Sequence, residues 1–291
     1  MSVRHRACSG LLLCAPLLLC LPSASSAQSG DNTGLSGGVI ESPSASSRFN
    51  DSDPLIDPRA VLPERPTVAT HAYTVAPGYV EIETGLQGAR PAGNGQLIAP
   101  VVIKLGLARR SQLELQGGYL RDESSGRTLS GASDLGVALK QRVVDGAPII
   151  ADFSVQGTVK LATGARDVGT GTTDVSLLLI SSRSLGRGEL DLNAGWTRRS
   201  GDGSTIPRDA SLLTASLGMP IGGRLGGVAE LFAYPGTGGA AGARPSIGFL
   251  VGPTVQLHRW FVLDAGAILD VQGMGANAVY AGLTWNAGKI R

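Results

Sequence analysis

Ionisable side chains recur at alternate positions in several stretches of this sequence, with mainly apolar residues between them. Side chains two positions apart lie on the same face of a β-strand, so these groups would gather on one face. Around the lumen of a barrel, these side chains would form rings that set the charge selectivity of a pore. If they instead paired with one another across strands, they would fill the lumen. The sequence leaves both outcomes open. The candidate lumen-lining residues are Glu81, Glu83, Lys104, Glu114, Asp134, Lys140, Arg142, Asp152, Lys160, Asp174, Asp191 and Asp264.

Other residues with catalytic or ligand-binding chemistry lack the partners that such sites need. His71 lies in a Pro-rich stretch, and His258 lies in a predicted short turn, where no second element marks a Ser-His-Asp site. The glycine-rich residues 169–171 are not followed by the Gly-Lys-Ser/Thr of a phosphate loop. Asp167 and Asp174 lack the ligand spacing of a calcium loop. We therefore predict no catalytic, cofactor-binding or metal-binding residues, and no enzyme activity.

Residues 134–161 show most clearly the elements that would carry the ionisable side chains. They read as two long strands joined by a tight turn at 145–148, with apolar and polar residues alternating at a period of two. In water, the apolar face would pack into the core of a sandwich or barrel. In an outer membrane, it would face lipid, and the polar face would line a lumen. The apolar face holds Leu135, Val137, Leu139, Val143, Ile149, Ala151, Phe153, Val155, Val159 and Leu161.

The same alternation predicts twelve strands in all. Seven are clear between residues 79 and 196, although Leu178 and Ile180 blur the pattern of the sixth. Twelve is an even number, as single-chain bacterial outer-membrane barrels require, and such a barrel is intermediate in width between small filled barrels and open porins. Weaker alternation places the last five strands at about 211–219, 225–234, 245–256, 260–270 and 278–286.

The connections between these strands differ in length in a regular way. Short turns alternate with long polar loops, and this is typical of a transmembrane barrel, in which the short turns are periplasmic and the long loops extracellular. A soluble sandwich has no reason to separate the two lengths. The short connections lie at 108–110, 145–148, 185–188, 220–223 and 257–259, and the long ones at 120–132, 162–173, 198–209 and 235–244.

Two segments precede the predicted barrel, which would span residues 78–291. Residues 1–27 have a basic start, a short apolar core and small residues at their end, and we predict a cleaved signal peptide. Residues 28–77 form an arm rich in Ser, Gly and Pro, and proline at this density blocks helices and central strands. Composition favours a largely disordered tether. A partial plug in the lumen, or an arm across the periplasmic mouth, are the alternatives.

Composition and charge narrow the classes of protein. The cysteines, Cys8, Cys14 and Cys20, all lie in the predicted signal peptide, so the mature chain would have no disulfide and no Cys-ligated metal. Without Arg4 and Arg6 the basic residues equal the 23 acidic ones, which argues against a nucleic-acid partner. Charged residues make up only 16% of the chain, compared with about a quarter in soluble domains. No run after the signal peptide is long and apolar enough for a membrane helix.

Several short motifs carry a family resemblance. They are Glu64-Arg65-Pro66 with residues 75–85, then residues 133–140, and then residues 159–164 with Gly169-Thr170-Gly171 and Asp174. With them, residues 64–286 resemble the outer-membrane family named for the MetA-pathway of phenol degradation, whose members are labelled transporters. The resemblance implies a porin-like barrel that passes small or aromatic compounds. Its motifs bear on the fold rather than on catalysis.

The sequence thus predicts an all-β protein, an antiparallel transmembrane β-barrel of about twelve strands in the bacterial outer membrane. Its partners would be outer-membrane lipid, the barrel-assembly machinery and a small-molecule solute. Trp285, close to the C-terminus, is the candidate signal for assembly. We expect a channel or transporter for small solutes. The alternatives are a structural or surface-interaction barrel with a filled lumen, a barrel enzyme and a secreted soluble β-protein.

Overall fold

The computed structural model describes residues 57–90, 94–124, 127–166, 168–204 and 206–290. The predicted signal peptide and residues 28–56 of the predicted arm lie outside the described residues. No helix in the described ranges is long and apolar enough to cross a membrane.

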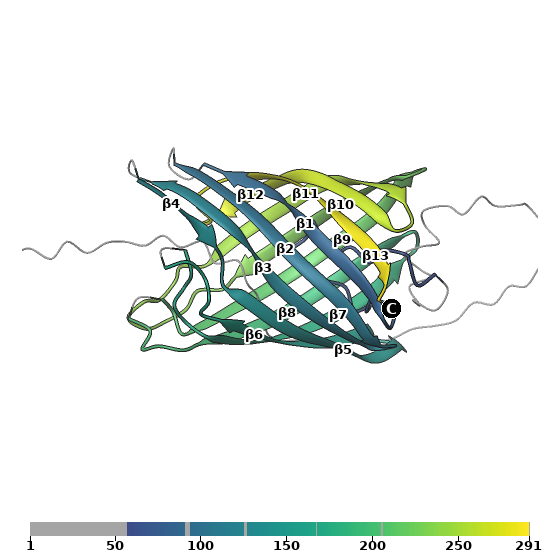
Figure 1. Ribbon diagram of the computed structural model, residues 1–291, viewed down its shortest axis with the longest axis horizontal. Coiled ribbons are helices and arrows are strands. Elements are labelled where there is room, and N and C mark those ends of the chain that lie inside the picture. Colours follow the sequence, from purple (N-terminus) through teal and green to yellow (C-terminus); the bar gives the residue numbers. More distant parts are fainter. Residues whose placement is uncertain (1–56, 91–93, 125–126, 167, 205, 291) are drawn as a thin grey trace, which may run out of the picture.

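The described chain is all β, and its strands follow one another around a barrel (Figure 1). Most are long for a globular protein, where five or six residues is the usual length, as the long alternating stretches of the sequence predict. The strands are β1 (Tyr79–Ala89), β2 (Gly95–Ala108), β3 (Ser111–Ser124), β4 (Arg127–Ala132), β5 (Leu135–Ala147), β6 (Ala151–Leu161), β7 (Asp174–Leu185), β8 (Gly188–Arg199), β9 (Asp209–Gly222), β10 (Leu225–Tyr234), β11 (Ser246–His258), β12 (Phe261–Gln272) and β13 (Ala278–Lys289).

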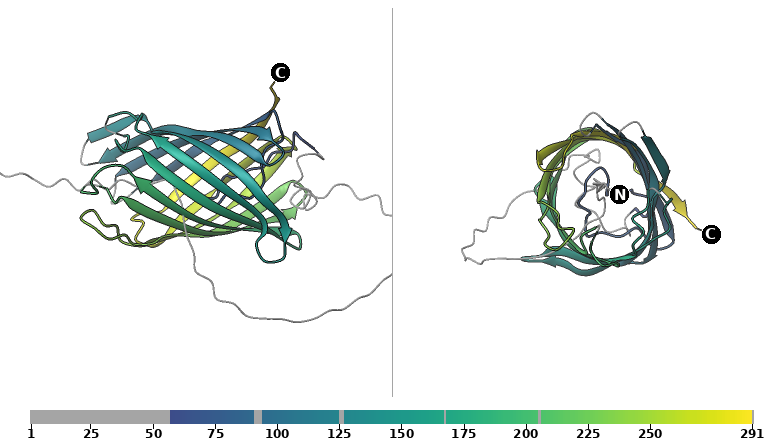
Figure 2. Two further views of the ribbon diagram at one scale, coloured as in Figure 1. Left: turned by 90° about the horizontal axis from the view of Figure 1, so that it is seen from below. Right: turned by 90° about the vertical axis from the view of Figure 1, so that its left-hand side faces the viewer.

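The sheet closes on itself. Sequential strands pair antiparallel, and β1 pairs along its whole length with β13, from Tyr79 opposite Lys289 to Ala89 opposite Ala278. Strands β4 and β5 both pair with β3, β4 with its second half and β5 with its first half, so together they form one position in the ring. The result is a closed antiparallel barrel of twelve strands, which confirms the predicted fold class. Figure 2 shows this ring along its axis.

One predicted loop is in fact partly strand. We expected residues 120–132 to be a loop, but β3 continues to Ser124 and pairs with β4 beyond the end of β5. The alternation there is carried by polar residues such as Arg121 and Glu123, which are exposed, so the apolar signal of a membrane strand is missing. This hairpin therefore extends the wall at the end with the long loops.

The short turns lie at one end of the barrel and the long loops at the other, as predicted. Two of the short turns have a glycine with positive φ at the first central position, Gly186 at 62° and Gly223 at 57°. This is the position where a type II′ turn requires glycine, and the twist of this turn matches that of the flanking strands. The longer connections lie between β6 and β7, β8 and β9, and β10 and β11.

The two faces of the barrel wall have opposite character, reversed relative to a soluble protein. Apolar side chains point outward and are exposed, for example Leu139 at 50%, while Lys104 and Lys140 are completely buried. An apolar exterior around an ionisable interior is stable when lipid surrounds the barrel. The arrangement supports a location in the outer membrane and argues against a soluble sandwich.

The outward face gives a direct test of this environment. Leu139→Arg would place a charge on the apolar exterior near the middle of β5, and should lower the free energy of unfolding by about 2–4 kcal/mol. Urea unfolding in lipid vesicles measures this, with Leu139→Ala as the control for lost apolar area. Equal stability of the Arg and Ala variants would show that this face does not contact lipid.

Candidate functional site in the barrel lumen

Residues 57–77, called here the inner segment, run through the inside of the barrel. In Figure 2 the described end of the chain enters the ring of strands rather than lying outside it. Ala72 and Thr74 have no exposed surface, and Val75 has 2%. The polar face of the wall therefore surrounds a stretch of the protein's own chain.

The inner segment does not join the sheet. It contains four prolines, Pro58, Pro63, Pro66 and Pro77, which cannot donate to a β-ladder. Its one β-bridge to the wall is an isolated pairing of Pro77 with Gly106, just before β1 begins. Backbone N–H groups buried in this way need other acceptors, because an unpaired buried donor is costly.

Side chains of the wall supply those acceptors. Glu230 accepts from two consecutive N–H groups, Val68 at 2.8 Å and Ala69 at 2.7 Å, and Asn193 both accepts from the Thr70 N–H at 2.7 Å and donates to its carbonyl at 2.8 Å. The remaining acceptors are Glu81 for Leu62, Glu83 for Glu64, Ser182 for Ala72 and Gln112 for Val75, at 2.7–2.8 Å. The wall thus holds an extended peptide through side chains from β1, β3, β7, β8 and β10.

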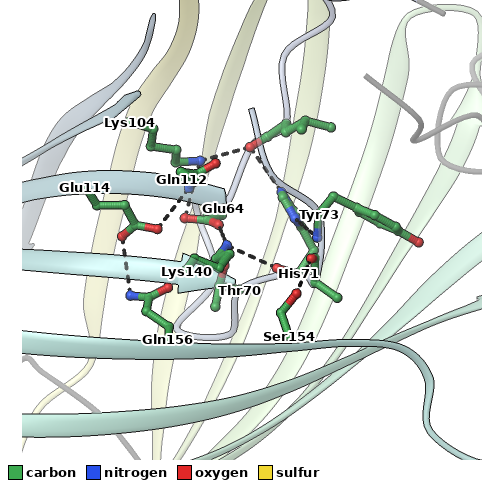
Figure 3. Close-up of polar contacts among 12 residues, drawn as sticks. Glu64, Thr70, His71, Tyr73, Lys104, Gln112, Glu114, Lys140, Ser154 and Gln156 are labelled. Carbon is green, nitrogen blue, oxygen red and sulfur yellow. Dashed lines mark hydrogen bonds and ion pairs between the residues drawn. The ribbon is translucent and has the colours of Figure 1, made fainter. Parts of the chain in front are cut away.

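The carboxylate of Glu64 lies between two buried ammonium groups of the wall (Figure 3). One oxygen forms an ion pair with Lys140, and the other lies 3.3 Å from the ammonium nitrogen of Lys104. Lys104 also contacts Glu81 at 3.0 Å and Glu83 at 2.6 Å, both neighbours on β1. The lysines come from β2 and β5, so this ion cluster joins four parts of the chain, the inner segment, β1, β2 and β5.

The protonation states of Glu64 and His71 in the inner segment follow from their burial and from the charges of the nearby lysines. Burial would raise the pKa of Glu64, but the positive charges of Lys104 and Lys140 hold that pKa well below its usual range. Burial and the charge of Lys140 lower the pKa of His71 from 6.5 to about 3. His71 is therefore neutral, with Nδ1 accepting from the Tyr73 N–H at 3.2 Å and Nε2 donating to the Leu62 carbonyl at 3.1 Å.

A second polar group surrounds Tyr73. Its hydroxyl donates to Asp152 at 3.3 Å and to Glu189 at 3.4 Å, and the guanidinium of Arg142 lies over its ring, 5.1 Å from the centroid. Arg142 also donates to Asp152 at 3.1 Å. Tyr73 is thus held by cation–π contact on one face and by carboxylates at its hydroxyl.

Arg65 of the inner segment lies close to the wall at a point where two paired strands each have a glycine. Gly85 of β1 pairs with Gly282 of β13, and a Cβ atom at either position would come within 2.7 Å of the Arg65 guanidinium. The backbone carbonyls of Ala281 and Thr84 come equally close, so glycine is required here by the approach of both the wall backbone and Arg65. The guanidinium lies 3.6 Å from the carboxylate of Asp264.

The inner segment also contacts apolar side chains on the inward face. Ala72 packs against Leu178 and Ile180 of β7. Val68 packs against a larger buried cluster that includes Phe232. These inward apolar residues break the polar pattern of the lumen at the places where small apolar residues of the inner segment touch the wall. The other buried members of the larger cluster are Leu212, Leu250, Ile268, Ala278 and Tyr280.

A third polar group lies at the end with the long loops. Lys160 forms ion pairs with Asp134 at 2.9 Å and Asp174 at 3.2 Å. Asp134 also accepts from the backbone N–H groups of Gly164 at 2.8 Å and Thr170 at 2.9 Å, both in the loop between β6 and β7. Burial would raise its pKa, but the hydrogen bonds from Lys160, Thr170 and Gly164 lower the pKa of Asp134 to about 2.

The structure brings the twelve candidate residues into separate groups rather than into continuous rings. Their side chains are buried or half-buried on the inward side of the wall, and most have an opposite charge beside them. The ion cluster around Glu64 contains Glu81, Glu83, Lys104 and Lys140, and Glu114 accepts from Gln112 and Gln116. Arg142 and Asp152 lie beside Tyr73, whereas Asp134, Lys160 and Asp174 lie at the loop end. Asp264 contacts Arg65, and Asp191 accepts from Ser182.

Sequence reasoning missed the residues of the inner segment that complete these groups. Glu64, Arg65 and Tyr73 lie in the Pro-rich arm, where no periodicity marks a face, and their partners are distant in sequence. His71 is buried, whereas His258, which we expected in a turn, is the exposed last residue of β11, and its ring stacks on that of Trp260 with 4.8 Å between the centroids. Among the described residues there is no group of three or more His, Cys, Asp and Glu that could hold a metal ion.

Comparison with known proteins bears on the fold. No family model matches the sequence, and no curated protein matches it. A COG4313 outer membrane channel from Pseudomonas putida F1 is similar over 78% of this chain and 99% of that chain, with a TM-score of 0.56 and 13% identity. The β domain of the Bordetella autotransporter BrkA matches over 71% of this chain and 98% of that chain, with a TM-score of 0.43 and 14% identity. The translocator domain of the autotransporter NalP from Neisseria meningitidis matches over 71% of this chain and 87% of that chain, with a TM-score of 0.39 and 13% identity. The first likeness shows that the chain has an outer-membrane barrel fold.

The burial of neutral His71 predicts a loss of stability in acid. Because its pKa falls from 6.5 to about 3 on burial, the unfolded chain takes up a proton that the folded one does not, so stability is full above pH 6.5 and declines as pH falls toward 3. His71→Gln should flatten this part of the profile of unfolding free energy in vesicles. His258→Gln, at the exposed end of β11, is the matched control, and identical profiles for all three proteins would contradict the assignment.

Asp134 should order the loop between β6 and β7. Asp134→Asn removes the ion pair with Lys160 and should speed trypsin cleavage at Arg166 in that loop. Asp270→Asn is the control, because Asp270 lies near the end of β12 and accepts from the Met274 N–H of a different connection. Because the folded pKa of Asp134 lies below its ordinary 3.8, its contribution is complete above pH 3.8 and is lost as pH falls through about 2. Unchanged cleavage in the Asn variant would dismiss this role.

Proposed function

We propose that this protein is an outer-membrane channel for small solutes, and that the inner segment closes its lumen until the segment shifts. The barrel-assembly machinery would insert the barrel, and outer-membrane lipid would surround it. The fold and the polar inward face support a channel. The resemblance implies aromatic compounds among the solutes, and the ionised wall favours solutes that carry polar or charged groups.

The mode of attachment of the inner segment carries this proposal. Its contacts with the wall are mainly those of side chains, and its one β-bridge lies at Pro77, beside β1. The segment can therefore move away from the lumen without breaking a ladder between wall strands. The carboxylates and amides that it leaves would be rehydrated and would line the pore.

A structural barrel with a permanently filled lumen is the second candidate. The observation that favours it is the fit of Arg65 against Gly85 and Gly282, because a side chain at either position would collide with the guanidinium. Such a fit indicates that the filled state is built into the wall. A channel must adopt this state when closed, whereas a structural barrel would never leave it.

A reversible disulfide separates the two candidates. The cysteines of the sequence are Cys8, Cys14 and Cys20, all in the predicted signal peptide, so new ones can be placed without competition. Ala72→Cys with Ser182→Cys would link the inner segment to β7, because the Ala72 N–H lies 2.8 Å from the Ser182 hydroxyl. Under oxidising conditions the pair should give no conductance steps in a planar bilayer, and reduction should restore them.

Single variants Ala72→Cys and Ser182→Cys control for the substitutions themselves and should conduct in both conditions. Conductance of the oxidised double variant equal to that of the reduced one would show that solutes pass without movement of the inner segment. No conductance from any form, including the unmodified chain, would favour the structural barrel.

A further inference from the structure

Lys140 is a buried wall residue that depends on the inner segment for its partners. Its side chain has no exposed surface. Within the described part of the chain, its ammonium contacts the Glu64 carboxylate, the Thr70 hydroxyl at 2.9 Å and the His71 carbonyl at 3.1 Å, all in the inner segment. When the segment leaves, Lys140 faces the lumen without an ion-pair partner.

Lys104 behaves differently, and the contrast defines a site. Lys104 keeps its contacts with Glu81 and Glu83, which belong to the wall, and loses those with Glu64 and with the Leu62 carbonyl at 2.9 Å. The two lysines thus enclose a position that one carboxylate, that of Glu64, now occupies with an oxygen toward each ammonium group. The two positive charges remain on the wall when the segment leaves, so this position should attract an anion from the lumen when Glu64 is absent.

The neighbouring charges restrict the kind of anion. Glu81 and Glu83 lie beside Lys104, and Glu114 lies close enough to both lysines to interact with them electrostatically. A dianion such as phosphate would bring a second negative charge toward these carboxylates, whereas a monocarboxylate reproduces the charge and shape of the Glu64 side chain. The structure itself shows that a carboxylate fits between Lys104 and Lys140.

We propose that the Lys104–Lys140 pair is a binding site for the carboxylate of a solute, and that Glu64 occupies this site in the closed state. The proposal rests on the proposed function in one respect, since a solute reaches the site only when the inner segment moves. It assigns small monocarboxylates as the class of solute that the lumen binds. Lys140 is the residue that recruits the solute, and Lys104 completes the contact.

Chemical replacement of the lost side chain tests the site in the full-length protein. Glu64→Ala removes the atoms that acetate contains, and so should lower the thermal unfolding midpoint. Added acetate should raise that midpoint in a saturable way, while acetamide, which has the same shape and no charge, and sodium chloride at equal ionic strength should not. In Glu64→Ala with Lys140→Gln, acetate should bind about tenfold or more weakly, because one charge-assisted hydrogen bond is lost.

The outcomes separate this proposal from the channel proposal, because thermal stabilisation does not require conduction. Equal effects of acetate and chloride, or of acetate with and without Lys140, would overturn the site even if the protein conducts. Stronger stabilisation by phosphate than by acetate would replace the carboxylate assignment. Saturable stabilisation by acetate in a protein that does not conduct would keep the site and reject the channel.

A second measurement does not need a variant at Glu64, in case that chain fails to fold. Benzoate should reduce the current through the unmodified channel in a concentration-dependent way, and benzamide should not. Lys140→Gln should weaken the benzoate effect about tenfold or more. Equal effects of benzoate and benzamide, or equal inhibition of both proteins, would contradict the proposal.

Discussion

The two buried ammonium groups of Lys104 and Lys140 set the constraint on which this structure depends. Neither has exposed surface, and an ammonium ion in such a place is tolerated only with anions and hydrogen-bond acceptors around it. The wall supplies Glu81 and Glu83 to Lys104 but leaves Lys140 to the inner segment. The barrel and the segment inside it are therefore electrostatically one unit, and these charges are satisfied with the segment in place.

The remaining features of the lumen follow from the same need. Proline-rich peptide cannot join the sheet, so its N–H groups require acceptors, and Glu230 and Asn193 provide them from the opposite side of the barrel. Arg65 needs a flat surface and a carboxylate, which Gly85, Gly282 and Asp264 provide. The outer face needs no such matching, because lipid accepts any apolar side chain. The specific contacts are consequently concentrated inside.

The strands of the barrel wall were more predictable from the sequence than the inner segment and its contacts. Alternation such as that around Leu139 and Lys140 has a period that only a strand gives, so it predicted the strands and their count. The hairpin at β3 and β4 was missed because its alternation is polar. Glu64 and His71 could not be placed, since their contacts depend on how the arm folds back. Leu178 and Ile180, apolar residues on a polar face, were an available signal, because they mark where Ala72 packs.

A double-mutant cycle between Glu64 and Lys140 tests most directly that the inner segment and the wall form one unit. The free energy of urea unfolding in lipid vesicles would be measured for Glu64→Gln, Lys140→Gln and the double variant. Each single change leaves a buried charge without its partner and should cost about 3–5 kcal/mol. The double change should cost clearly less than their sum. Additive costs would show that these two residues are not coupled and would contradict this account of the lumen.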